Sequence, residues 1–108
     1  MITVRIIRDA SNEKIGFRSA GHAEFDDPGR DIICAAVSVL ELNLANSVSG
    51  LTDARFSCEV GEEGSFFFSL PSRENEKAAL LLDSCLLGLE AIREEYGSYY
   101  LTISDQEV

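Results

Sequence analysis

Basic residues are scarce in this chain of 108 residues, which has nine lysines and arginines against nineteen aspartates and glutamates. The formal net charge is −10. Nucleic-acid binding needs a concentrated basic surface that displaces counterions, and the basic residues here are scattered. The sequence therefore predicts no direct nucleic-acid partner. An acidic surface attracts basic proteins, although solubility alone explains such a charge equally well.

Cysteine is also sparse, and the three cysteines are Cys34, Cys58 and Cys85. An odd number of widely separated cysteines argues against a disulfide framework. Neither the cysteines nor the single histidine, His22, shows the ligand spacing of a zinc site, so we expect no metal and no cofactor. Cys58 and Cys85 lie at apolar positions of a strand and a helix, and both are expected in the core.

The sequence has no uninterrupted apolar run as long as a membrane span. Its first strand carries Arg5 and Arg8 and is followed by no small-residue cleavage site, which argues against a signal peptide. These absences predict a soluble, cytoplasmic protein that has no membrane partner. The length suits one domain, residues 1–108, with a single core.

Apolar periodicity predicts seven secondary-structure elements. Alternation indicates strands at residues 2–8, 14–22, 55–60, 65–70 and 99–104. Three- and four-residue spacing indicates helices at residues 32–49 and 72–96. The order ββαββαβ predicts an α+β two-layer sandwich, in which two helices cover one face of a mixed or mostly antiparallel sheet of about five strands.

Some large apolar residues exceed what one small core needs, which favours a homodimer that buries part of them. They are Leu42, Leu51, Leu80, Leu87 and Tyr100. Within Phe66-Phe67-Phe68, alternation sends Phe67 to the opposite face from its neighbours. Phe67 is therefore a candidate for a dimer or substrate surface.

His22 and Cys34 are the candidate chemical pair. With Asp31 as N-cap and Gly50 just past the end of the helix, Cys34 is the third helical residue, where backbone N–H groups lack partners. These amides and the helix dipole favour thiolate over thiol. A nearby imidazole acts as general base and then as general acid. The common alternative is a cysteine that packs in the core and a histidine that is structural.

Two short motifs make the catalytic interpretation more specific. Gly21-His22-Ala23 and the run from Asp31 to Ser38, DIICAAVS, resemble the signature of the bacterial ribosomal-processing cysteine proteases. The resemblance extends over almost the whole chain. It implies a catalytic dyad of His22 and Cys34, a dimeric state, and removal of a short hydrophobic, aromatic-containing N-terminal extension from a large-subunit ribosomal protein.

Several neighbours of the dyad are candidate supporting residues for orientation, capping and the oxyanion region. Asp31 either orients His22 or caps the helix, and capping is favoured because a carboxylate beside the sulfur opposes ionisation. Ala35 is small enough to let a substrate backbone approach. Ser38 lies one turn after Cys34 on the same helical face, and Gly21 precedes the histidine.

The segment between the dyad residues is acidic and contains strong turn residues, which predicts a loop that gates substrate access. Its candidate gating residues are Asp27, Pro28, Gly29 and Arg30. The alternative to a protease is a non-catalytic dimeric module that assists ribosome assembly or binds a protein. Reactivity of the Cys34 thiol distinguishes the two.

Overall fold

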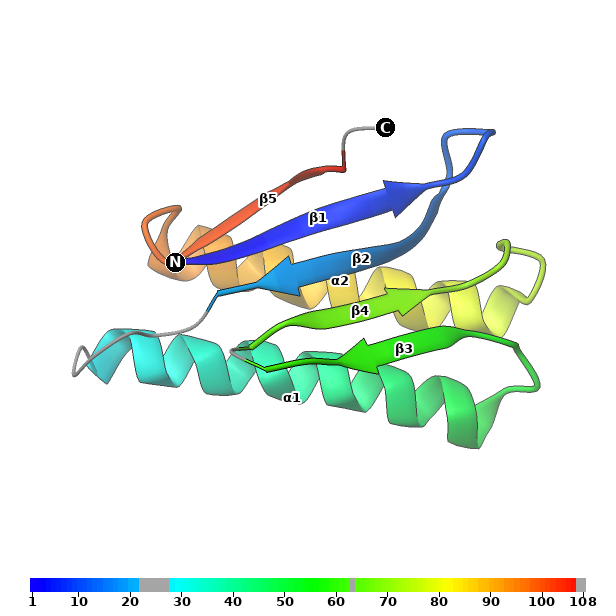
Figure 1. Cartoon of the computed structure of the whole chain (residues 1–108), viewed down its shortest axis with the longest axis horizontal. Helices are drawn as coiled ribbons and strands as arrows, with labels where there is room; N and C mark the ends of the chain where they lie inside the picture. The colour runs from blue at the N-terminus through cyan, green and yellow to red at the C-terminus, as the bar shows by residue number, and fades with distance from the viewer. Residues whose placement is uncertain (22–27, 63, 107–108) are drawn as a thin grey trace.

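The computed structural model describes residues 1–21, 28–62 and 64–106, with residues 28–31 described as backbone only. Five strands and two helices follow one another in the predicted order ββαββαβ (Figure 1). The strands are β1 (Ile2–Arg8), β2 (Lys14–Ala20), β3 (Ser57–Val60), β4 (Phe66–Ser69) and β5 (Leu101–Asp105), and the helices are α1 (Pro28–Leu51) and α2 (Glu76–Tyr96). The α+β class is confirmed.

The strands form one mixed sheet in the order β3-β4-β2-β1-β5. Only β1 and β5 are parallel, whereas β1–β2, β2–β4 and β3–β4 are antiparallel. Register places Phe17 opposite both Ile6 and Phe68, so these three side chains share one face. All three are buried with apolar residues of both helices in a single core.

The opposite face of the sheet carries a second row of side chains. Arg5 pairs with Arg18, and Arg18 pairs with Phe67. The Arg18 guanidinium lies over the Phe67 ring, 4.3 Å from its centroid. The alternation prediction is confirmed, because Phe66 and Phe68 are buried while Phe67 is half-buried beneath this arginine.

Helix α1 has the predicted apolar stripe but different ends. Ile33, Val37, Leu44 and Val48 are buried, and Leu40 packs against the core. The helix begins at Pro28, where proline is tolerated because the first-turn N–H has no intrahelical partner. It continues through Leu51, so Gly50 lies inside it, and the predicted stop at Gly50 is wrong.

Helix α2 begins at Glu76, four residues later than predicted. The side chain of Asn75 caps it by accepting a hydrogen bond from the backbone N–H of Ala78 at 3.0 Å. The C-terminal prediction is confirmed, because Gly97 follows with φ of 97° and its N–H donates to the carbonyl of Arg93. Three- and four-residue spacing also predicts Tyr96 on the apolar stripe of this helix, but Tyr96 is exposed, so that prediction is wrong.

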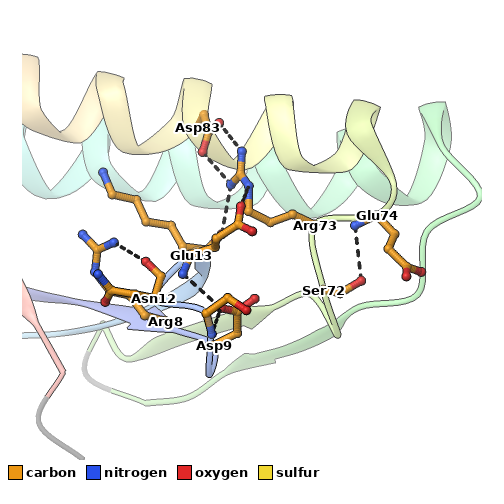
Figure 2. A network of polar contacts seen from close by, with 10 residues as sticks. Arg8, Asp9, Asn12, Glu13, Ser72, Arg73, Glu74 and Asp83 are labelled. Carbon is orange, nitrogen blue, oxygen red and sulfur yellow. Dashed lines mark hydrogen bonds and ion pairs between the residues drawn. The ribbon is translucent and has the colours of Figure 1, made fainter.

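Arg73, in the connection between β4 and α2, joins three parts of the fold (Figure 2). Its guanidinium donates to both carboxylate oxygens of Asp83 on α2, at 2.9 and 2.6 Å. It also donates to the carbonyl of Lys14 on β2 and lies 3.6 Å from a carboxylate oxygen of Glu13 in the β1–β2 turn. The arginine thus fixes the sheet against α2.

Four of the five large apolar residues predicted to exceed the needs of the core are exposed. Leu42, Leu51, Leu80 and Leu87 are exposed, whereas Tyr100 packs against the core and was wrongly included. The segment Ile32–Leu51 of α1 is also long and apolar enough to cross a membrane by length and composition. The search for an uninterrupted apolar run missed this segment. Polar residues interrupt the run, but they do not lower the mean hydropathy of the segment enough to exclude it. A core helix of a soluble protein meets the same criterion.

Candidate active site

Cys34 lies on α1, half-buried and packed against the edge of the core. It is the seventh residue counted from Pro28, and not the third of the helix as predicted. Only the first four amides of a helix lack intrahelical acceptors, so the amide of Cys34 is outside that set. The prediction that unpaired first-turn amides surround the sulfur and stabilise its thiolate is therefore wrong.

The early start of α1 also changes the roles expected for the residues before Cys34. Asp31 is the fourth helical residue, so its prediction as N-cap is wrong. Pro28, Gly29 and Arg30 form the first turn of α1 and do not belong to a gating loop as predicted. Asp27 lies outside the described residues. The physical reason is that proline, a turn former in a loop, is equally suited to a first helical turn.

Gly21 marks the end of β2 and has a φ of 98°. A Cβ at this position would clash with the carbonyl oxygen of Met1. Both this close contact and the positive φ therefore require a glycine. His22, the next residue, lies outside the described residues. The end of β2 and the first turns of α1 lie toward the same end of the molecule (Figure 1).

The helix presents small residues around the cysteine. Ala35 is exposed and Ala36 is half-buried directly after Cys34. Ser38 is exposed one turn further along and lines a small pocket together with Glu41. Since residues four apart are neighbours on a helix, Cys34 and Ser38 share one face of α1 as predicted.

Glu41 is a buried acid that the sequence-based prediction missed. Its side chain is only 5% exposed, and the Ser19 hydroxyl on β2 donates a hydrogen bond to its carboxyl. Burial raises the pKa of Glu41 from 4.5 to about 7, although the hydrogen bond from Ser19 lowers it. The signal was present, because Glu41 lies four residues after Val37 and three before Leu44 on the apolar stripe.

Of the other two thiols, Cys85 is buried in the core as predicted, whereas Cys58 is only half-buried and packs against the core. Cys85 is buried, and desolvation together with the charge of Glu41 raises the pKa of its thiol to about 12. Desolvation and the charges of Glu41 and Glu59 also raise the pKa of Cys58. No disulfide joins these cysteines. Within residues 1–21, 28–62 and 64–106, no cluster of three or more metal-ligating side chains occurs.

A two-layer α+β fold that carries a half-buried cysteine on its first helix, with a histidine-containing segment after β2, defines a candidate cysteine hydrolase. The model of the family described as cysteine protease Prp matches residues 1–101. The chain belongs to this family and is a cysteine protease.

Two curated relatives are each described as ribosomal processing cysteine protease Prp. The protein of Bacillus subtilis (strain 168) is 31% identical over 101 residues, which cover 89% of this chain and 90% of the relative. The protein of Staphylococcus aureus (strain Mu50 / ATCC 700699) is 32% identical over 97 residues, which cover 89% of this chain and 92% of the relative.

Two crystal structures of the essential ribosomal processing protease Prp from S. aureus have the same fold. The complex with a substrate peptide has a TM-score of 0.87 and 28% identity, over 98% of this chain and all of the other. The complex with a covalently linked product peptide has a TM-score of 0.85 and 29% identity, over the same shares of both chains.

Proposed function

We propose that this protease removes a short hydrophobic, aromatic-containing N-terminal extension from a bacterial large-subunit ribosomal protein. The observation that carries the proposal is the likeness, over 98% of this chain, to the S. aureus protease that holds a substrate peptide. The net charge of −10 is consistent with a basic ribosomal substrate, although solubility explains such a charge equally well. A cytoplasmic location is part of the proposal, because ribosomal proteins are made there.

Cys34 is the proposed nucleophile and His22 the proposed general base and acid. His22 takes the thiol proton while the sulfur attacks the scissile carbonyl carbon, and it then protonates the leaving amine as the C–N bond breaks. Water hydrolyses the resulting thioester, which releases the acid product and regenerates the thiol. The covalently linked product peptide in the S. aureus structure supports an enzyme-bound intermediate of this kind.

The supporting roles are proposed on the placement of the described side chains. The small, exposed Ala35 leaves room for a substrate backbone beside the sulfur. Ser38 is exposed one turn beyond, where its hydroxyl can bond to a bound peptide. Since α1 begins at Pro28, activation of the thiol depends mainly on the imidazole and less on the helix terminus.

A homodimer formed through the outer surface of the two helices is part of the proposal. A groove of about 510 Å³ between α1 and α2 is lined by apolar atoms almost throughout, from Ala35, Ala36, Val39, Leu40, Gly88 and Ile92. Val39 is 65% exposed and the nearby Leu87 68%. A second copy that packs on Val39 and Leu87 would remove both from water, while Ala35, the groove residue next to Cys34, would stay open to substrate. The proposed assembly includes no nucleic acid and no membrane.

Cleavage of a peptide that spans the ribosomal extension tests the proposed function. The Cys34→Ala variant should lose all cleavage and keep its fold, as measured by mass spectrometry of the products and by circular dichroism. Cys58→Ala is the matched control, since it removes a thiol remote in sequence from the dyad and should keep activity. Cleavage by Cys34→Ala would exclude this nucleophile. A wild-type protein that binds the peptide without cutting it would instead indicate a binding module.

A further inference from the structure

A small pocket lies between α1 and the turn that joins β3 to β4. Its volume is about 90 Å³. Leu42, Val60 and Phe66 contribute apolar surface, while Ser38, Ser65 and Glu41 contribute polar groups. A mostly apolar pocket with a few polar groups has the composition of a site that recognises a side chain.

The pocket lies on the same face of α1 as the nucleophile. Cys34, Ser38 and Glu41 follow one another at four- and three-residue steps, which is the spacing of one helical face. Seven residues at 1.5 Å each place Glu41 about 10 Å from Cys34 along the helix axis. We take the substrate to lie extended along α1, where a peptide advances about 3.3 Å per residue, so a side chain in the pocket belongs about three residues from the scissile bond.

Glu41 is the most buried of the polar residues that line the pocket. One of its carboxyl oxygens accepts the hydrogen bond from the Ser19 hydroxyl. Among the described residues, two titratable groups on other elements interact electrostatically with Glu41. They are the thiols of Cys58 on β3 and Cys85 on α2, and neither is a cation. A carboxylate that is desolvated and has no cationic partner is held largely protonated, so the pocket is close to neutral below pH 7.

We propose that this pocket is a specificity subsite, in which Glu41 selects an uncharged substrate side chain and excludes an acidic one. The inference rests on the proposed peptidase function. Once Glu41 ionises above neutral pH, a substrate carboxylate in the pocket would meet a like charge in a desolvated site, which opposes binding. The protonated form of Glu41 can donate a hydrogen bond to an uncharged acceptor. As Glu41 ionises above neutral pH, that donor is lost and exclusion of acidic side chains becomes stronger.

The test is a scan of the extension peptide in which each position in turn is replaced by Gln, Glu or Lys. At pH 8, where Glu41 is mostly ionised, the wild-type protein should show one position, about three residues from the scissile bond, where Glu lowers kcat/KM by about tenfold or more relative to Gln, mainly through KM. The Glu41→Gln variant should abolish that difference. Glu59→Gln, which removes the same charge from an exposed position on β3, should leave it unchanged.

The same peptides should also be titrated against the Cys34→Ala variant with and without Glu41→Gln, by calorimetry. The binding affinity reports on the subsite even if no peptide is cleaved. Failure of the protease proposal is therefore distinguished from failure of the subsite proposal. An equal Glu penalty with and without Glu41 would overturn the subsite, and so would a wild-type preference for Lys over Gln at pH 6, where Glu41 is largely protonated. Absence of any peptide binding would overturn both proposals.

Discussion

The hydroxyl of Ser19 on β2 donates a hydrogen bond to the carboxyl of Glu41 on α1. These residues lie three positions before His22 and seven after Cys34, so the bond ties the strand that leads to the histidine to the helix that carries the cysteine. Few polar bonds in the described fold are buried, and this one lies between the sheet and α1. The ionisation state of Glu41 therefore affects both the stability of the fold and the surroundings of the proposed site.

Stability should fall as pH rises through the range in which Glu41 ionises. The pKa is 4.5 in the unfolded chain and about 7 in the fold, so the folded state binds more protons between these values. Stability from this group is complete below pH 4.5 and is lost as pH rises through 7. A shift of this size corresponds to a loss of about 3 kcal/mol. Urea unfolding at pH 5 and pH 8 measures most of this loss.

Glu41→Gln should remove this part of the pH dependence, because the amide does not ionise. The variant should be more stable than the wild-type protein at pH 8 and show no such gain at pH 5. Glu59→Gln controls for the change in net charge, since Glu59 is exposed. Equal pH dependence of the wild-type protein and Glu41→Gln would show that folding does not raise the pKa of Glu41.

The three cysteines should differ in their reactivity toward iodoacetamide near neutral pH. Cys34 should be alkylated fastest, because Cys85 is buried with a pKa of about 12 and the pKa of Cys58 is also raised. His22→Ala should slow alkylation of Cys34 and leave the other two rates unchanged. Digestion and mass spectrometry give the rate at each site, and equal rates would count against the dyad.

Arg73→Ala should destabilise the protein more than Arg8→Ala does. Arg73 makes a bidentate pair with Asp83 and a third bond to the Lys14 carbonyl, so we expect a loss of about 2 kcal/mol. Arg8 pairs at 2.9 Å with Asp105, whose side chain is 63% exposed, and donates to the Asn12 carbonyl at 2.8 Å; both contacts are exposed, and together they contribute about 1 kcal/mol. Thermal unfolding compares the two variants, and equal losses would contradict the role given to Arg73.

Gly21→Ala should reduce both stability and activity, since a Cβ there clashes with the Met1 carbonyl and the backbone has a positive φ. The cost should be about 1–3 kcal/mol, and the histidine next to it should be displaced. Gly50→Ala is the matched control, because no atom lies within 4 Å of the added Cβ in this helical position. It should stabilise the protein by up to about 1 kcal/mol. Melting temperature and cleavage rate measure both effects.

Val39→Glu should convert the proposed dimer into monomers, because it places a charge in the apolar groove between α1 and α2. Leu51→Glu, at a residue that is 70% exposed and does not line this groove, is the control and should leave the assembly unchanged. Sedimentation velocity measures the state of each variant. A wild-type monomer would refute the dimer, and dissociation by both variants would move the interface elsewhere.

Periodicity in the sequence determined the element order, the layer architecture and most of the core. Alternation in β1 and the stripe Ile33, Val37, Leu44 and Val48 are local patterns, and each requires one buried face wherever the element packs. The family also followed from local residues, since the motifs around His22 and Cys34 are contiguous in the chain. The matches over residues 1–101 confirm that identification.

The tertiary structure decided where α1 begins, and this changed the position of Cys34 from the third to the seventh helical residue. Local sequence cannot distinguish Pro28 in a turn from Pro28 at a first helical position, because both conformations suit its fixed φ. The structure also decided that Glu41 is buried against Ser19. That pairing joins residues 22 positions apart, and only packing of α1 on β2 brings the two side chains together and removes the carboxyl from water.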